Sequence, residues 1–461
     1  MDSKLLSNEN MSLKAKFLRY MIPSVVSMWV FSLYTMVDGI FVARGVGETA
    51  LAAVNISMPF VNFIFALSLM FSTGASTIIA VYLGKKDIES ADKIFTMNTV
   101  VIIIFSLLIM GGVLLNLEKV ATMLGATAST IDYVKHYLGI IVLFNGFFMV
   151  SYSLEVIIKT DGFPVLATCG VIISALSNVV LDYLFIMVFH WGVMGAAIAT
   201  GLSQVFSTVF FLVHFFRKNS TLNFSRFKFD FPELKKIAFI GIPDSTTELS
   251  CGIVVMLFNL NIIKYIGEQG VVYYSIINYV NTLVLMTMMG IAQGMQPLVS
   301  YYFGAENSTN MKKLFKMSAI AGVIASAAFV VICHIIPDFI VGLFIDPTET
   351  AIFTEAIRVL QIYSYAFAFM GINVIVSAFF VSVERPGIAA VVSLGRGFFL
   401  ILVALYLMIA ILGGEGIWYS AILAEGTCMI IAIVLYKTKI KAVYKEMRLP
   451  KAKKEKLNEC Y

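Results

Sequence analysis

The sequence predicts an all-α, polytopic membrane protein with 12 transmembrane helices in two pseudo-symmetric bundles of six. The first observation behind this prediction is composition. Of the 461 residues, 59% are hydrophobic and only 13% are charged, and the mean hydropathy is +0.90. Soluble domains carry about 25% charged residues. A water-exposed surface cannot be built from so few charges, so most of the surface is expected to face lipid.

The second observation is a series of apolar runs, each long enough to cross a hydrocarbon core, which takes about 20 helical residues. In the first half they lie at 17–43, 52–83, 95–117, 134–158, 164–189 and 192–216. In the second half they lie at 237–263, 271–303, 314–337, 353–382, 386–411 and 416–436. We therefore expect an N-terminal six-helix lobe (1–216), a cytoplasmic linker (217–236), a C-terminal six-helix lobe (237–440) and a basic cytoplasmic tail (441–461).

The third observation is an internal repeat. Ile22-Pro23 recurs as Ile242-Pro243, and Tyr82-Leu83-Gly84 recurs at the same spacing as Tyr302-Phe303-Gly304. Each repeat holds an even number of spans, so the two lobes should have the same orientation and be related by an axis along the membrane normal. Transporters built in this way place their substrate site near the bilayer midplane, at the repeat interface.

The basic residues predict the orientation of the chain. Of the 33 Lys and Arg residues, one lies within a span (Arg396), and the loops opposite the termini hold only Arg44, Lys119, Lys135, Lys264 and Arg358. The others lie on the side of the termini. The positive-inside rule therefore predicts that both termini are cytoplasmic.

Ionisable residues inside the spans are the main functional signal, because each costs at least ~2.5–3.5 kcal/mol at mid-depth unless it faces protein or a wet cavity. Asp38 lies in the first span, Asn178 and Asp182 lie one turn apart in the fifth, and Thr200 lies in the sixth. The alternating direction of the spans puts all four at a similar depth in the outer half. Converging oxygen ligands of this kind could hold a proton or a hard cation such as Na⁺. The alternative is that each aspartate only hydrogen-bonds a neighbour and locks helix packing.

A second group of polar residues provides candidates for the substrate cavity or for a second coupling site: Asp244, Glu248, Glu425, Arg396, Glu155 and Gln204. Arg396 and Glu425 both lie near mid-depth, so a structural ion pair between them is an open alternative. Glu155 lies one turn before Lys159, and an interfacial pair is equally open there. The second lobe nevertheless has more buried acids than arginines, and this excess would suit a cationic substrate or a second proton site.

Pro23 is a predicted hinge, because proline breaks the helical hydrogen-bond ladder and bending the first span would move Asp38. Several motifs are missing from the sequence. Without a GxxxxGK[ST] phosphate loop, ATP is not expected as the direct energy source. Neither HExxH, GxSxG nor a nucleophile–His arrangement occurs, and the cysteine spacing fits neither a zinc site nor a disulfide framework. We therefore expect no enzyme activity, no structural metal and no cofactor other than a coupling ion.

Specific motifs in the spans resemble the multidrug and toxic compound extrusion (MATE) family. They are Ile22-Pro23 and Asp38-Gly39 in the first span, Asn178-x-x-x-Asp182 in the fifth, and Gly192-x-x-Gly195-Ala196-Ala197 at the start of the sixth. The segment from Leu154-Glu155 to Asp161-Gly162-Phe163-Pro164 is similar to that of the DinF-type branch, which includes drug-exporting pumps of Gram-positive bacteria. The resemblance covers essentially residues 15–440.

The resemblance implies a V-shaped, MATE-like bundle that works as a secondary active exporter. H⁺ or Na⁺ would run inward while an amphipathic, cationic drug or toxic compound is expelled by alternating access. The coupling site would comprise Asp38, Asn178, Asp182 and Thr200, and Pro23 would mark the bend of the first span. The expected location is the bacterial cytoplasmic (inner) membrane. The expected partners are small organic cations and membrane lipid, without nucleic acid, and the chain is expected to be a monomer.

Two other functions are alternatives to export. A lipid-linked oligosaccharide flippase of the wider superfamily would bind an anionic pyrophosphate and should present several inward-facing basic residues, where this sequence offers Arg396 alone. An intramembrane enzyme would need a catalytic constellation, which the sequence lacks. The identity of the substrate and the choice between H⁺ and Na⁺ stay open at this point.

Overall fold

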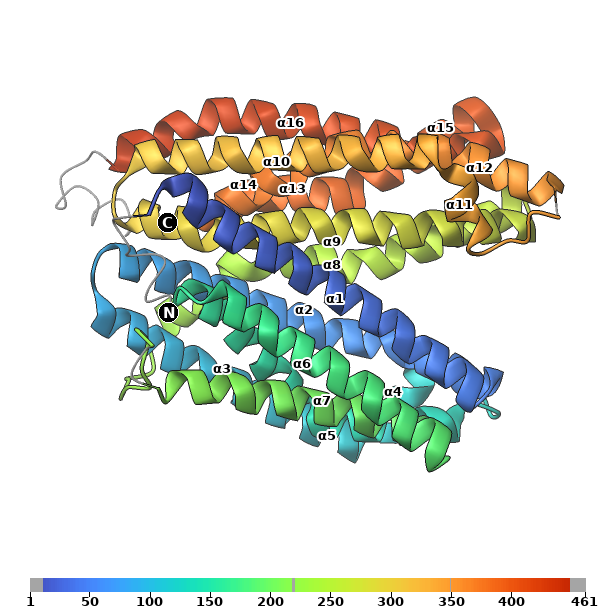
Figure 1. The fold of residues 1–461 in the computed structure, drawn as a ribbon, viewed down its shortest axis with the longest axis horizontal. Coiled ribbons are helices and arrows are strands. Elements are labelled where there is room, and N and C mark those ends of the chain that lie inside the picture. Colours follow the sequence, from blue (N-terminus) through green and yellow to red (C-terminus); the bar gives the residue numbers. More distant parts are fainter. Residues whose placement is uncertain (1–10, 218–219, 349, 448–461) are drawn as a thin grey trace. The chain divides into compact units, whose positions relative to one another are not determined.

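The computed structural model describes residues 11–217, 220–348 and 350–447, and all elements in these ranges are helical. The first half contains α1 (Leu13–Gly45), α2 (Glu48–Gly84), α3 (Ile88–Leu115), α4 (Leu117–Met123), α5 (Ile131–Thr160), α6 (Pro164–Asp182), the π-helical segment η1 (Tyr183–Val188) and α7 (Gly192–Phe215) (Figure 1). The second half contains α8 (Phe231–Tyr265), α9 (Glu268–Gly304), α10 (Ser308–Ile335), α11 (Pro337–Gly342), α12 (Thr350–Ser364), α13 (Phe367–Ser382), α14 (Pro386–Leu394), the π-helical segment η2 (Gly395–Phe399), α15 (Leu400–Leu412), the 3₁₀ turn η3 (Gly413–Glu415) and α16 (Gly416–Met447).

Within the described residues, 11 helical stretches are long and apolar enough to cross a membrane. One of them, Pro386–Met447, covers two of the predicted spans. It turns at η3, and α15 and α16 pack against each other on either side of that turn. Counted as two helices, this hairpin accounts for the difference from the 12 predicted spans, and the all-helical, multi-pass fold is confirmed.

Some element bounds differ from the apolar runs. The helix α8 begins at Phe231, inside the predicted linker, and α16 continues to Met447, inside the predicted basic tail. The rest of that tail, 448–461, lies outside the described residues. Both extensions are polar helical turns, which a search for apolar runs does not include.

The internal repeat is present in the backbone. Gly47 and Gly267, which precede α2 and α9, have φ angles of 108° and 101°, in the left-handed region that favours glycine. Asp87 and Asn307 precede α3 and α10 with the same backbone angles, φ −95° and ψ 79°. Each of these two side chains caps its helix by accepting a hydrogen bond from the backbone N–H three residues on, at 3.1 and 3.0 Å. Equivalent residues in the two halves therefore start their helices in the same way.

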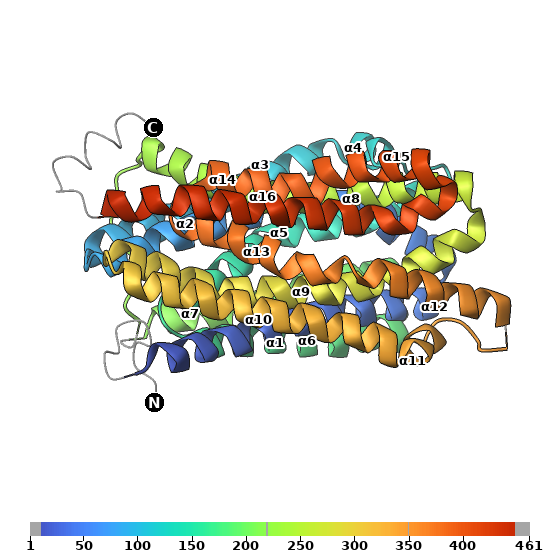
Figure 2. The same ribbon diagram turned by 90° about the horizontal axis from the view of Figure 1, so that it is seen from above.

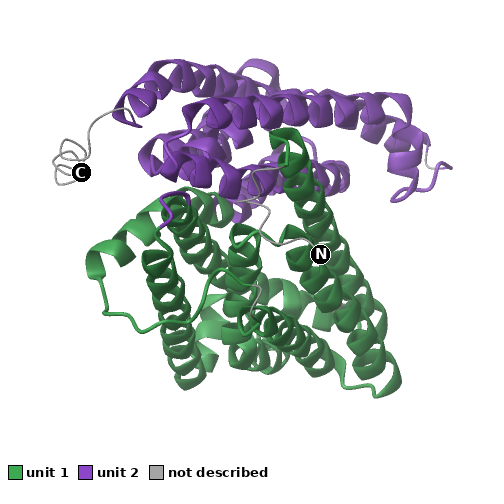
Figure 3. Ribbon diagram, turned by 60° about the vertical axis from the view of Figure 1, so that its left-hand side comes forward, with its two compact units in different colours: residues 1–83, 87–249 green, residues 84–86, 250–461 purple. Residues whose placement is uncertain are grey.

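The chain divides into two compact units, unit 1 (1–83 and 87–249) and unit 2 (84–86 and 250–461) (Figure 3). In unit 1, α5 packs on α3 and α7, while α6 packs on α1 and α7. In unit 2, α9, α10 and α13 pack together and α13 also packs on α16 (Figure 2). The division falls within α8, so the first part of that helix belongs to unit 1.

Two glycines explain why the first part of α8 belongs to unit 1. A side chain at Gly74 of α2 would collide with the backbone of Ile237, and one at Gly241 of α8 would collide with the backbone of Met70. Small residues of this kind allow membrane helices to approach closely. The helices α2 and α8 therefore pack backbone to backbone at this point.

The segment between α7 and α8 is tied to unit 1 through Asp161. One carboxylate oxygen accepts hydrogen bonds from the backbone N–H groups of Thr221 and Leu222, at 2.8 and 3.2 Å. The other oxygen accepts from the Ser220 hydroxyl at 3.0 Å and lies 2.8 Å from Nε2 of the buried His214. A carboxylate with this many partners holds the segment firmly.

Candidate functional site

Three of the predicted site residues lie close together inside unit 1. The carboxyl groups of Asp38 on α1 and Asp182 at the end of α6 are direct neighbours. Asn178 lies one turn before Asp182 on the same helix face, and both side chains are completely buried. We call Asp38, Asn178 and Asp182 the aspartate cluster.

The polar atoms of the aspartate cluster are largely without partners. Both amide atoms of Asn178, both carboxylate oxygens of Asp182 and Oδ1 of Asp38 are buried and make no hydrogen bond. More than 90% of buried polar groups in proteins are paired, and an unpaired one costs about 1–3 kcal/mol. Two neighbouring carboxyl groups can hydrogen-bond each other only when they hold a proton. The cluster is therefore chemically suited to bind a proton or a cation.

An apolar layer lies one helical turn from the aspartate cluster. Val42, Ile186 and Ala196 belong to a single buried core cluster in unit 1. Val42 and Ile186 follow the two aspartates by one turn, and Ala196 precedes Thr200 by one turn. Because α1 and α6 run in one direction and α7 in the other, all three residues lie on the same side of the site. This layer separates the aspartates from the end of the bundle that the basic-residue distribution predicts to be external.

Sequence reasoning missed two tyrosines beside the aspartate cluster. The hydroxyl groups of Tyr34 on α1 and Tyr137 on α5 are close enough to interact electrostatically with both Asp38 and Asp182. Tyr34 lies one turn before Asp38, so the spacing of the first span contained a signal for it. Tyr137 comes from a different helix, and nothing in the local sequence indicates its position.

Hydrogen-bonded polar side chains continue from the aspartate cluster into the interior of unit 1. Gln204 on α7, predicted as a cavity candidate, is buried and donates a hydrogen bond to Ser174, one turn before Asn178, at 3.3 Å. Farther along, Ser151 of α5 donates to Ser207 of α7 at 3.0 Å. Gln204 therefore lies between α6 and α7, within the helix packing of unit 1.

Glu155 is engaged in an ion pair. Its Oε1 lies 2.7 Å from Nζ of Lys159, and the exposed fractions of the two side chains are only 8% and 2%. The pairing between adjacent turns is the one expected from the spacing, although it is buried rather than interfacial. A buried pair of this kind is costly to break, since the remaining charge would have no partner.

Two further acidic candidates, Asp244 and Glu248, lie on the part of α8 that belongs to unit 1. Both are half-buried, and the Asp244 carboxyl lies beside the Thr73 hydroxyl of α2. Within the described residues neither acid forms an ion pair. From the sequence, both acids are expected in the second lobe. In the structure they belong to unit 1, together with α2.

In unit 2, Arg396, Glu425 and Asn373 form what we call the arginine cluster. Nη2 and Nε of Arg396 donate hydrogen bonds to Oε1 of Glu425, at 2.8 and 3.1 Å. Asn373 donates to the other carboxylate oxygen at 2.6 Å and to the Glu425 carbonyl at 3.0 Å. The structure therefore contains the ion pair that the sequence left as an alternative. A flippase would need Arg396 for a phosphate, but this arginine is committed to Glu425.

Pro23 lies inside α1, which continues through it as a single helix. The Thr168 hydroxyl of α6 donates a hydrogen bond to the Pro23 carbonyl at 2.8 Å, and Ser27 donates to Thr168 at 2.9 Å. These bonds join α1 to α6 at the predicted hinge. The part of the chain that the structure describes contains no group of three or more His, Cys, Asp or Glu residues that could hold a metal ion.

Known proteins resemble this chain over nearly its whole length. The protein-family model MatE matches residues 23–184 and 246–412. The multidrug export protein MepA of Staphylococcus haemolyticus is 24% identical over 436 residues, which cover 94% of this chain and 95% of that protein. MepA of Staphylococcus aureus strain NCTC 8325 is 25% identical over 441 residues, covering 94% and 96%.

Two solved structures, described as MATE in the bent conformation and in the straight conformation, have the same fold as this chain. The bent one has a TM-score of 0.89 at 22% identity and covers 97% of this chain and 100% of that one. The straight one has a TM-score of 0.89 at 23% identity and covers 96% and 98%. With its helical fold, its internal repeat and the extent of the family match, this chain belongs to the MATE family of multi-pass membrane proteins.

Proposed function

We propose that this protein is a secondary active exporter that couples the inward movement of protons to the expulsion of amphipathic, cationic drugs or toxic compounds. It would work in the bacterial cytoplasmic membrane, as a monomer with both termini inside. Two kinds of relative support this proposal, the staphylococcal proteins named for multidrug export and the structures described as bent and straight. A pump whose binding site opens alternately to the two sides of the membrane needs at least two conformations.

The observation that carries the proposal is the aspartate cluster with its unpaired, buried oxygens. Membrane proteins pair or expose ionisable groups unless these groups bind or move ions. Asp38 and Asp182 would take up a proton when open to the outside and release it to the inside. Thr200, on the neighbouring helix, would line the same site.

The geometry favours a proton over a sodium ion. Hard cations need several oxygen ligands arranged around them. The aspartate cluster and Thr200 would offer two carboxylates, one amide oxygen and one hydroxyl. The two carboxyl groups are direct neighbours, and a single proton is sufficient to join them. We therefore propose H⁺ as the coupling ion.

The proposed substrate class follows from the acids on α8. Asp244 and Glu248 are half-buried one turn apart and form no ion pair among the described residues, so they are suited to attract an organic cation. The movement of α1 about Pro23 would change the access of Asp38 between the two states. The hydrogen bond from Thr168 to the proline carbonyl would hold one of these states.

Transport in proteoliposomes tests this proposal. Ethidium export by the reconstituted protein should be driven by an imposed pH gradient and not by a Na⁺ gradient, and Asp38→Asn or Asp182→Asn should abolish it. Asp132→Asn is a matched control, because Asp132 is an exposed residue at the start of α5. Export driven by Na⁺ alone would reject the proton, and normal export by both aspartate variants would reject the coupling site.

A further inference from the structure

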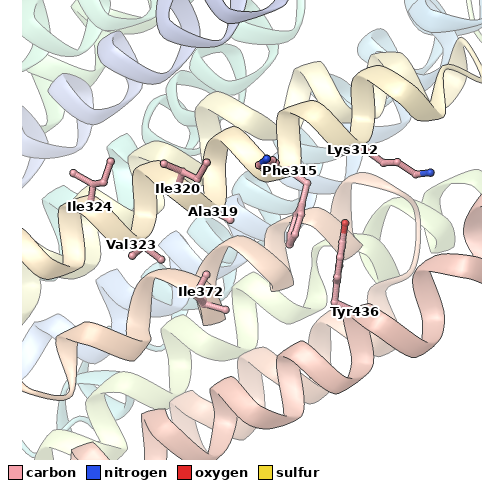
Figure 4. A pocket seen from close by; sticks show the side chains of 9 residues that line it. Lys312, Phe315, Ala319, Ile320, Val323, Ile324, Ile372 and Tyr436 are labelled. Atoms are coloured by element: carbon pink, nitrogen blue, oxygen red, sulfur yellow. The ribbon is translucent and has the colours of Figure 1, made fainter.

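A groove with a volume of about 420 Å³ lies on unit 2, between α10, α13 and α16 (Figure 4). Its walls include Lys312, Lys316, Phe315, Ile320, Ile324 and Tyr436. All of these residues belong to unit 2, and none of them is in the aspartate or arginine cluster. We call this feature the lysine groove.

The two ends of the lysine groove have different chemistry. Lys312 and Lys316 are exposed and lie in the first turns of α10, at the end of the helix that the basic-residue distribution predicts to be cytoplasmic. Farther along the same helix the groove is lined by Ile320 and Ile324, which are 48% and 64% exposed. From Lys312 to Ile324 the helix rises about 18 Å, more than half of a ~30 Å hydrocarbon core.

Aromatic side chains shape the charged end of the groove. Tyr436 of α16 stacks on Phe315 of α10, with ring centroids 4.0 Å apart and an angle of 12° between the planes. The Lys312 ammonium lies 4.4 Å from the centre of the Tyr444 ring, a cation–π contact that holds this lysine near the mouth of the groove. Lys316 follows Lys312 by one turn, about 6 Å along the helix, so both can reach the same phosphate.

We propose that the lysine groove binds one anionic phospholipid from the inner leaflet, with the headgroup phosphate on Lys312 and Lys316 and an acyl chain along Ile320 and Ile324. Basic pockets between transmembrane helices at the cytoplasmic side bind anionic headgroups in this way. The positive end of the α10 dipole adds to the attraction. The cationic compounds proposed for export are unsuited to this groove, because the two lysines repel them. The bound lipid would join α10, α13 and α16 along the outside of unit 2.

Native mass spectrometry of the full-length protein, taken from nanodiscs of phosphatidylcholine with a small fraction of phosphatidylglycerol, tests the proposal. The wild type should retain one phosphatidylglycerol molecule. Each lysine is expected to contribute about fivefold in affinity, so Lys312→Gln with Lys316→Gln should weaken retention about 25-fold. Lys313→Gln is the control for the loss of one charge, because it removes one lysine from the same turn but does not line the groove.

A second variant tests the apolar part of the groove. Ala319→Trp would fill the groove while leaving both lysines in place, and it should also displace the lipid. Equal retention of phosphatidylglycerol by the double lysine variant and the wild type would overturn the proposal. A loss of phosphatidylglycerol in Lys313→Gln as large as in the double lysine variant, or equal retention of phosphatidylcholine, would overturn it as well.

Discussion

The aspartate cluster of unit 1 and the arginine cluster of unit 2 share one pair of equivalent spans, since Asn178 and Asp182 lie on α6 and Arg396 lies on the corresponding span that begins with α14. Both spans begin with a proline in the first helical turn, Pro164 and Pro386, and both contain a π-helical segment. The two acids of the aspartate cluster are buried without a basic partner among the described residues, whereas Glu425 of the arginine cluster is neutralised by Arg396. The repeat therefore preserves the backbone but not the charge, and of these two clusters the aspartate cluster is the one that still needs a positive charge.

The π-helical segments lie at different places in the two spans. The helix α6 has 19 residues before η1, so Asp182 directly precedes the wide turn. The helix α14 has only nine residues before η2, and Arg396 lies inside the wide turn. Because a π turn contains an extra residue, it changes the direction of the side chains around it. The two spans therefore present different residues to their surroundings.

The largest expected effect is a difference in export between variants of the aspartate cluster and variants of the arginine cluster. Asp182→Asn should reduce ethidium export to background, because the neighbouring carboxyl pair is lost. The double variant Arg396→Gln with Glu425→Gln should still export, since it removes both members of a neutral pair. Export assays in cells, with the protein level in the membrane measured in parallel, check this prediction. Equal loss in both variants would mean that the clusters do not differ in function.

The next largest effect is a loss of stability, which is expected when one member of the arginine cluster is replaced. Glu425→Leu leaves the Arg396 guanidinium buried without its carboxylate, and this should lower the free energy of unfolding by about 3–5 kcal/mol. Adding Arg396→Leu should restore most of that loss, because no buried charge then remains. Thermal unfolding of the purified single and double variants measures both changes. A double variant no more stable than the single one would show that the ion pair itself stabilises unit 2.

A smaller effect is expected where α1 meets α6. Thr168→Val removes the hydroxyl that bonds to the Pro23 carbonyl and to Ser27, and should cost about 1 kcal/mol of stability. If this bond holds one transport state, the rate of export should change as well. Thr35→Val is the control, because Thr35 is exposed and its hydroxyl donates to the Phe31 carbonyl within the same helix. Identical transport rates in the two threonine variants would show that the Thr168 hydrogen bond has no role in the transport cycle.

The smallest expected effect is the change in stability when Asp182 of the aspartate cluster is replaced. Asp182→Asn breaks no ion pair and keeps a polar side chain of similar size, so the free energy of unfolding should change by less than about 1 kcal/mol, the net value of one hydrogen bond, in contrast to the loss expected for Glu425→Leu. The same thermal unfolding measurement checks it. A loss of several kcal/mol would reveal a structural partner for Asp182 and would weaken the contrast between the units.

Local sequence information was sufficient for most of the fold. The apolar runs located the membrane helices, because a membrane-spanning helix needs about 20 consecutive, mostly apolar residues. Residue spacing also brought Asn178 and Asp182 to one helix face. The apolar runs did not include the polar turns at the start of α8 and at the end of α16.

The tertiary structure alone decided which polar groups have partners. Asp38 and Glu425 are both acids within apolar spans, yet Oδ1 of Asp38 has no partner, whereas Glu425 receives hydrogen bonds from Arg396 and Asn373. The proximity of Tyr137 to the aspartates and the four partners of Asp161 are likewise set by distant segments. The physical reason is that pairing depends on how each helix is rotated about its axis, and that rotation is set by side-chain packing and by the π turns. The sequence by itself determined where charges enter the membrane, and the packing of the helices determined which of them remain free to act.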